Sequence, residues 1–180
     1  MTIHAGHPFA GGESEPLRRF RGRMPAAVSV WVAERGGRRA GWTLSSFLVA
    51  QGEPGEVVGI VDEDSDLADL LEPGTPFTVN LLGWSHRALA DAFAGVAPAP
   101  GGAFRLAEWR DTVWGPVLAD ASWLGARLTT APDHAGWGLL VRAVIEHVEI
   151  ADEPTPTESP MLMVARGRYR AVEPVVRPSG

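Results

Sequence analysis

One stretch constrains the fold more than any other: two runs with strand-type alternation, joined by a pair of glycines. In residues 27–34 valines alternate with other side chains, which is the two-residue period of a β-strand. Gly36 and Gly37 follow and permit the positive φ angles of a tight turn. The stretch of residues 39–54 then returns as a second strand and runs into a Gly-Pro loop, so the sequence predicts a hairpin and favours an antiparallel sheet.

The rest of the chain shows short strands with few helices between them. Further strand patterns occupy residues 55–63, 76–83, 119–132, 137–150 and 161–172, and helical patterns occupy residues 16–24, 65–74 and 85–95, the last two with Ser65 and Ser85 as N-caps. Residues 109–118 have no regular pattern. One strand–helix–strand unit does not make a doubly wound sheet, and no glycine-rich nucleotide fingerprint follows any strand. The fold class indicated is mainly β, an antiparallel barrel with flanking helices.

Composition excludes several kinds of chemistry. The chain has no cysteine, which removes disulfides, thiolate metal sites and thiol catalysis. Its histidines lack metal-ligand spacing, so no metal site is expected. The sixteen basic residues are all arginine, and the net charge of −6 argues against nucleic acid as a partner. No apolar run is long enough to span a membrane, and no signal-peptide pattern opens the sequence, so the cytoplasm is the expected location.

Three hydroxyl side chains cluster in the returning strand of the first hairpin: Thr43, Ser45 and Ser46. In a regular strand Thr43 and Ser45 would share one face and Ser46 would take the other. These hydroxyls either satisfy backbone groups at a strand end or bulge, or line a groove and donate hydrogen bonds to a polar ligand. The residues alone leave both interpretations open.

Two other polar positions also carry two interpretations. Ser65 follows a strand, so it either caps a helix or helps to form an anion site, although Asp64 and Asp66 oppose an anion there. Asp133 and His134 fall in a predicted tight turn between strands. A histidine there is either solvated or, beside a carboxylate, able to bind or protonate a ligand.

Arginines alternate near the end of the chain, at Arg166, Arg168 and Arg170. On one strand they would share a face, as a charged edge that resists aggregation or as a basic strip for an anionic ligand or a subunit contact.

Taken in order, these segments resemble the flavin reductase-like, FMN-binding split-barrel proteins, which include the small reductase components of two-component flavin monooxygenases. The resemblance runs from about Leu17 to Val172. It rests on the order and spacing of "LRRFRGRMPAAVSVWVA", "AGWTLSSF", "DSDLADLLEPGTPFTVNLL", "LADAFAG", "DHAGWGLLVRAVIEHVEI" and "ARGRYRAV". It implies an antiparallel split β-barrel that forms a homodimer, with FMN or FAD near the dimer interface.

The resemblance also assigns roles to residues. It places flavin contacts at Trp42, Thr43, Leu44, Ser45 and Ser46, at the following turn of Val49, Ala50 and Gln51, and at Ser65 for the phosphate. It places Asp133 and His134 beside the nicotinamide. The implied reaction is hydride transfer from NAD(P)H to the flavin, after which reduced flavin leaves for a partner monooxygenase. The chain itself would hold two flat rings in contact, without a catalytic side chain.

Several positions depart from the family pattern. The family usually has Arg at the position of Asp66, and its loss should weaken FMN binding by about 1–3 kcal/mol. The other departures are Pro25, Ala26 and Ala27 for Ala-Thr-Gly, Trp42 for Met, Val49 and Gln51 for small hydroxyl residues, Pro132 for Gly, and Ala165 for His. Two alternatives to the reductase therefore stay open: a flavin carrier or sensor without turnover, and a dimeric scaffold that has lost the cofactor.

The domain organisation expected is simple. Residues 1–14 are predicted to be a disordered leader, residues 15–175 a single FMN-binding split-barrel domain, and residues 176–180 a tail.

Overall fold

The computed structural model describes residues 16–151 and 160–172; the predicted leader, residues 1–14, and the predicted tail, residues 176–180, lie outside them. The two α-helices are α1 (Pro16–Gly22) and α2 (Arg87–Phe93), and the 3-10 helices are η1 (Ala68–Leu70), η2 (Trp84–His86) and η3 (Ala103–Leu106). The strands are β1 (Ala26–Ala27), β2 (Ser29–Arg35), β3 (Arg38–Leu44), β4 (Phe47–Ala50), β5 (Glu56–Asp62), β6 (Pro76–Leu81), β7 (Trp109–Thr112), β8 (Gly115–Leu118), β9 (Trp123–Leu128), β10 (Asp133–Ala135), β11 (Gly138–Glu149), β12 (Met161–Ala165) and β13 (Arg168–Val172). No helix in these described ranges is long and apolar enough to cross a membrane.

The main sheet curls into a barrel in which every strand pair is antiparallel. Its order is β3-β2-β6-β9-β11-β5-β4, with β10 paired to β11. The two edge strands, β3 and β4, are consecutive in the chain and are joined only by Ser45 and Ser46. The Ile60 amide of β5 donates to the Ser46 carbonyl at 2.9 Å. The connection between the edges therefore joins the two open sides of the sheet.

Strand β2 lies between two hydrophobic cores, which explains why both of its faces are apolar. Trp31 and Ala33 belong to the core inside the barrel, whereas Val30 and Val32 belong to a second core beneath α2. The predicted β2–β3 hairpin is confirmed, with Arg35 opposite Arg38 and both turn glycines at positive φ. A two-residue turn of this kind needs positive φ at both positions, which glycine adopts without steric cost.

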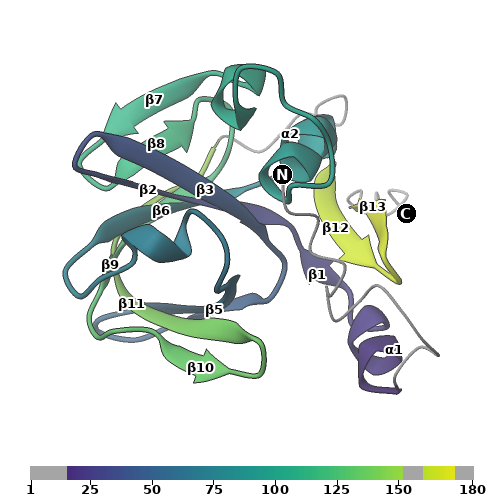
Figure 1. The fold of residues 1–180 in the computed structure, drawn as a ribbon, viewed down its shortest axis with the longest axis horizontal. Helices are drawn as coiled ribbons and strands as arrows, with labels where there is room; N and C mark the ends of the chain where they lie inside the picture. The colour runs from purple at the N-terminus through teal and green to yellow at the C-terminus, as the bar shows by residue number, and fades with distance from the viewer. Residues whose placement is uncertain (1–15, 152–159, 173–180) are drawn as a thin grey trace, which may run out of the picture.

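Two smaller sheets complete the fold. Strands β1, β12 and β13 form one, and β7 and β8 form the other. Figure 1 shows α1 at the margin of the molecule, near β1 and the β12–β13 hairpin. Its apolar side chains, Leu17 and Phe20, are 69% and 65% exposed. The helix therefore packs little apolar surface against the part of the chain that the structure describes.

Three strand predictions are wrong. The returning strand does not continue through residues 45 and 46, because it bends there and restarts as β4. Residues 109–118 form the β7–β8 hairpin rather than an irregular segment. Residues 161–172 form a hairpin rather than one strand, so Arg166 lies in the turn and does not share a strand face with Arg168 and Arg170.

The loop and helix predictions need similar correction. Residues 65–74 contain only the 3-10 turn η1, because the chain must return quickly as β6 while Leu67, Leu70 and Leu71 enter the barrel core. The helix over residues 85–95 is confirmed, but its first turn is η2 and Ser85 lies inside that turn rather than capping it. Asp133 and His134 lie on β10 rather than in a turn.

Candidate functional site

A groove of about 1410 Å³ opens between the barrel and the α1 segment. Its barrel side is the bend at residues 45–48, residues 58–60 of β5 and Leu140 of β11; its other side is residues 21–27, with Arg18 and Arg19, and residues 164–167 of the β12–β13 turn. Ligand pockets usually measure about 300–1,000 Å³. The groove is therefore larger than a typical single-ligand pocket, and it is open to solvent.

The three clustered hydroxyls have different roles in the structure. Thr43 Oγ1 donates to the Ala90 carbonyl of α2 at 2.7 Å, and Ser46 Oγ donates to the Ile60 carbonyl at 3.2 Å. The interpretation as backbone satisfaction is therefore confirmed for these two. Ser45 lines the groove, and its hydroxyl has no hydrogen-bond partner within the described ranges. Ser45 is thus the hydroxyl of the three that is available to a ligand.

Aromatic packing inside the barrel holds the bend at Ser45 and Ser46 in place. Leu44 is buried, and Phe47 packs edge-on against Trp31 with ring centroids 6.3 Å apart. Gly59 pairs with Phe47 across the β4–β5 ladder, and a Cβ added there would lie 2.6 Å from the Trp31 ring. The absence of a side chain at residue 59 therefore lets Trp31 fill the barrel directly under the groove floor.

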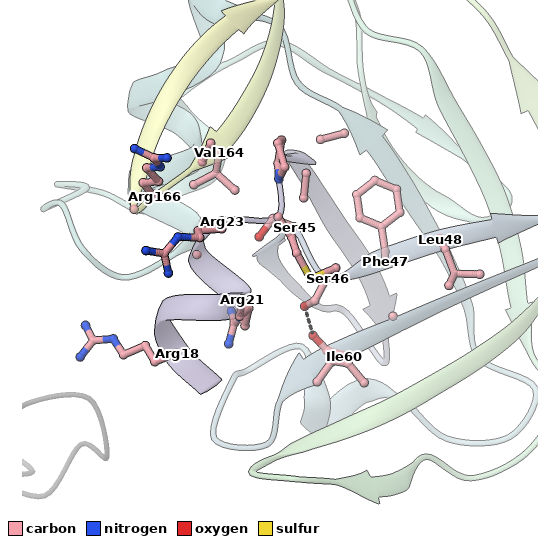
Figure 2. Close-up of a pocket in the computed structure, with 18 of the residues that line it drawn as sticks. Arg18, Arg21, Arg23, Ser45, Ser46, Phe47, Leu48, Ile60, Val164 and Arg166 are labelled. Atoms are coloured by element: carbon pink, nitrogen blue, oxygen red, sulfur yellow. Dashed lines mark hydrogen bonds between the residues drawn. The ribbon is translucent and has the colours of Figure 1, made fainter. Parts of the chain in front are cut away.

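Arginines dominate the outer rim of the groove. Figure 2 shows the side chains of Arg18, Arg21, Arg23 and Arg166 on one side of Ser45 and Ser46, with Phe47, Leu48 and Ile60 on the other. No aspartate or glutamate is among the described residues that line the groove. One rim is therefore cationic, the floor carries hydroxyls, and the opposite wall is apolar.

The β12–β13 turn holds Arg166 in this position. Arg166 and Gly167 have φ angles of 53° and 69°, and Ala165 pairs with Arg168 across them, so the hairpin has the two-residue turn that usually carries Asn-Gly. The Arg166 amide donates to the Gly22 carbonyl at the end of α1 at 2.5 Å. This bond joins two segments far apart in the sequence at one rim of the groove.

A half-buried tyrosine fixes the same hairpin to the rest of the molecule. Tyr169 Oη donates to Asp91 Oδ1 of α2 at 2.8 Å. Burial, together with the neighbouring Asp91 carboxylate, raises the pKa of the Tyr169 phenol well above its ordinary value.

The other residues assigned to the flavin do not line the groove. Trp42 packs against the barrel core and Leu44 is buried, while Val49, Ala50 and Gln51 are exposed on β4 and just after it. Ser65 is 3% exposed; its hydroxyl donates to the Asp62 carbonyl at 2.7 Å and accepts from the Ala68 amide at 3.2 Å. The structure therefore brings Ser45 and Ser46 into the groove, but not the rest of this set.

The two residues assigned to the nicotinamide are also outside the groove. Asp133 and His134 are exposed on β10, and His134 Nδ1 lies 3.6 Å from a carboxylate oxygen of Glu63.

The position where the family usually has Arg is acidic and already paired. Asp66 accepts a hydrogen bond from Arg38 at 2.8 Å, and the same guanidinium donates to Asp69 at 3.1 Å. Asp62 and Asp64 lie on the same turn. We call residues 62–69 the acidic turn. Its charge is wrong for a phosphate, as the sequence indicated.

Sequence reasoning missed the groove arginines as site residues. The pattern "LRRFRGR" predicted a helix with arginines on one face but gave no sign of what that face adjoins. For Arg166 the signal was present, since a basic strip for an anionic ligand was one of the two interpretations of the arginine alternation.

Comparison with solved structures first gives the class of fold. The NADH:FAD oxidoreductase SgcE6 of Streptomyces globisporus, in complex with NAD and FAD fragments, is 20% identical, with a TM-score of 0.75 over 93% of this chain and 100% of that one. BorF, the flavin reductase component of a bacterial two-component tryptophan halogenase, is also 20% identical, with a TM-score of 0.75 over 90% and 99% of the two chains. The predicted split-barrel fold is confirmed.

Sequence comparison then gives the family. The model of the flavin reductase like domain matches residues 21–173, and the chain belongs to that family, as the resemblance predicted. A curated relative, the FMN reductase (NADH) RutF of Ancylobacter novellus, is 29% identical over 108 residues. The match covers 59% of this chain and 59% of that relative.

The donor set of the groove fits a flavin nucleotide. Guanidinium groups bind phosphate with charge-assisted hydrogen bonds, and the Ser45 hydroxyl suits a ribityl or carbonyl oxygen. The apolar wall of Leu48, Val58 and Ile60 suits a flat ring.

Proposed function

We propose that this chain is an NAD(P)H-dependent flavin reductase that supplies reduced FMN or FAD to a partner monooxygenase. The observation that carries the proposal is the groove itself: a cationic rim, an available serine and an apolar wall meet in a chain of the flavin reductase family. When bound, a flavin accepts a hydride equivalent from a reduced nicotinamide. The chain contributes by holding the two rings in contact and away from water.

The groove residues have separate tasks in this proposal. The wall of Leu48, Val58 and Ile60 holds the flavin ring and excludes water, and Ser45 donates a hydrogen bond to one of its polar atoms. Ser46, fixed on the Ile60 carbonyl, positions the bend that presents Ser45.

The assay that tests this function is NADH oxidation in the presence and absence of added FMN. We expect oxidation that depends on flavin and saturates with it, and comparing FMN with FAD and NADH with NADPH identifies the pair that is used. Absence of oxidation at saturating flavin contradicts the proposal. Flavin binding without oxidation would instead support the carrier or sensor. Asp66, at a position where the family usually has Arg, favours both this alternative and the scaffold without a cofactor. Absence of flavin binding would support the scaffold.

For the nicotinamide, we keep Asp133 and His134 as proposed contacts. The His134→Ala variant should have a raised KM for the nicotinamide, with the Kd for flavin unchanged. A collapse of flavin binding would show that His134 is assigned to the wrong ligand.

We also propose a homodimer in the cytoplasm. Its support is the apolar surface that α1 and β4 leave exposed, at Leu17, Phe20, Leu48 and Val49. Light scattering coupled to size-exclusion chromatography tests the dimer, and a monomer at micromolar concentration contradicts it.

A further inference from the structure

We infer that the arginines of the groove, and not the acidic turn, bind the phosphate or diphosphate of the nucleotide ligand. The inference rests on the proposed function and specifies which part of the chain recognises the charged end of the flavin or of the nicotinamide.

The first argument is charge pairing. The arginines on the barrel surface are engaged with carboxylates: Arg35, Arg38, Arg39, Arg110, Arg127 and Arg142. Among the residues that the structure describes, Arg21, Arg23 and Arg166 have no such partner. The same holds outside the groove for Arg105, Arg168 and Arg170, so the lack of an ion pair points to a site only together with the geometry of the groove. Arg23 instead donates weakly to the Arg19 carbonyl, at 3.4 Å. The guanidinium groups of the three groove residues Arg21, Arg23 and Arg166 are therefore free of ion pairs within the described chain and available to an anion.

The second argument is geometry. The bond from the Arg166 amide to the Gly22 carbonyl joins the β12–β13 turn to the segment that carries Arg21 and Arg23. Figure 2 shows these arginines on the same side of Ser45. A phosphate bound by them would leave the rest of the nucleotide free to extend past Ser45 toward the apolar wall.

The third argument excludes the acidic turn. The Ser65 hydroxyl is buried and makes two hydrogen bonds within its own turn, so it is not available to a phosphate. The nearest guanidinium there belongs to Arg38, and it is held between Asp66 and Asp69. A phosphate at this turn would meet carboxylates before it met a free cation.

The experiment measures phosphate discrimination by equilibrium binding. Fluorescence titrations give Kd values for riboflavin, FMN and FAD, and for reduced nicotinamide riboside and NADH, with the wild-type chain and with an Arg21→Gln/Arg166→Asn variant. Asparagine suits residue 166 because it adopts positive φ readily. Arg110→Gln is the matched control, since Arg110 pairs with Glu149 at 2.6 Å and does not line the groove.

The wild-type chain should bind at least one phosphorylated ligand about 10-fold to 100-fold more tightly than its phosphate-free counterpart. The double variant should lose most of that preference and keep its affinity for riboflavin, while Arg110→Gln keeps the preference. The flavin pair and the nicotinamide pair show separately which nucleotide supplies the phosphate. The inference is overturned if the double variant keeps its preference for phosphorylated ligands. It is also overturned if the wild-type chain shows no such preference. If the inference fails but the chain still oxidises NADH in an FMN-dependent way, the proposed function is retained.

Discussion

The acidic turn and the arginine-lined groove lie in the same small domain, and their charges are arranged in opposite ways. In the acidic turn every side-chain group that a phosphate would need is used internally: Ser65 closes its own turn, and Arg38 is held by Asp66 and Asp69. In the groove, Arg21 and Arg166 have no carboxylate partner within the described ranges. The Ser45 hydroxyl has no hydrogen-bond partner there either. The same residue types are thus structural in one region and available in the other.

The difference shows that residues at a position expected from a family pattern can already be engaged within the chain. The resemblance implies a phosphate contact at Ser65, and the neighbouring Asp66 has the wrong charge for one. The groove beside the bend at Ser45 and Ser46 nevertheless contains arginine side chains without carboxylate partners in the described chain. Recognition of a charged group follows unpaired charge in the folded chain, and not residue position alone.

The largest expected effect comes from reversing charge in the groove. Arg21→Glu should weaken FMN binding by about 10-fold to 100-fold, because a charge-assisted hydrogen bond is replaced by repulsion. Arg110→Glu adds the same charge on the barrel surface and should leave the Kd for FMN nearly unchanged. Fluorescence titration of FMN measures both.

A rescue experiment sharpens the same comparison. Adding Asp66→Arg to the Arg21→Glu variant restores the net charge and gives the acidic turn the residue usual in the family. The arrangement in the structure predicts no recovery of FMN affinity. Full recovery would place the phosphate at the acidic turn.

The next effect concerns the bond that fixes the groove hairpin. Tyr169→Phe removes the hydrogen bond to Asp91 and should lower the free energy of unfolding by about 1 kcal/mol. Because the pKa of Tyr169 is raised in the folded state, this contribution is complete below the ordinary tyrosine pKa of about 10 and is lost as pH rises above it.

Denaturant unfolding of wild type and Tyr169→Phe across alkaline pH measures this loss. The difference between the two chains should be constant at neutral pH and shrink above about pH 10. Since Tyr169 is the one tyrosine in the sequence, difference absorbance in the near ultraviolet reads its ionisation directly. Ionisation of the folded chain at the ordinary tyrosine pKa would contradict the assignment.

A smaller effect, with opposite signs in two assays, is expected at Arg166. Its φ of 53° disfavours a side chain, so Arg166→Gly should stabilise the fold by up to about 1 kcal/mol. The same change removes a groove cation and should weaken FMN binding. Loss of both stability and affinity would show that the side chain supports the hairpin instead.

The smallest effect is expected at Arg38. Both of its partners are exposed ion-pair carboxylates, and such pairs contribute little to stability. Arg38→Ala should therefore leave the unfolding midpoint and the Kd for FMN close to wild type. A large loss of FMN affinity would mean that the acidic turn takes part in binding after all.

Sequence patterns predicted the fold well where each residue's neighbours are close in the chain. Valine alternation and Gly36-Gly37 identified the β2–β3 hairpin, because strand period and turn geometry are local properties. The β12–β13 hairpin was missed because its turn is Arg166-Gly167, and arginine is not a usual residue at positive φ.

The candidate site was harder to predict because it depends on contacts between distant segments. Ser45 was identified from the sequence, but Thr43 beside it turns to the Ala90 carbonyl, 47 residues away. Likewise, nothing local in "LRRFRGR" shows that Gly22 meets the amide of Arg166. The cationic rim arises from that long-range contact, and a pattern of neighbouring residues does not encode it.

The most direct test is a crystal structure of the chain with FMN bound. We predict the flavin ring against Leu48, Val58 and Ile60, and the phosphate within about 3 Å of a guanidinium nitrogen of Arg21, Arg23 or Arg166. A phosphate bound instead at Ser65 and Asp66, with the groove arginines pointing to solvent, would contradict the assignment of the groove as the nucleotide site.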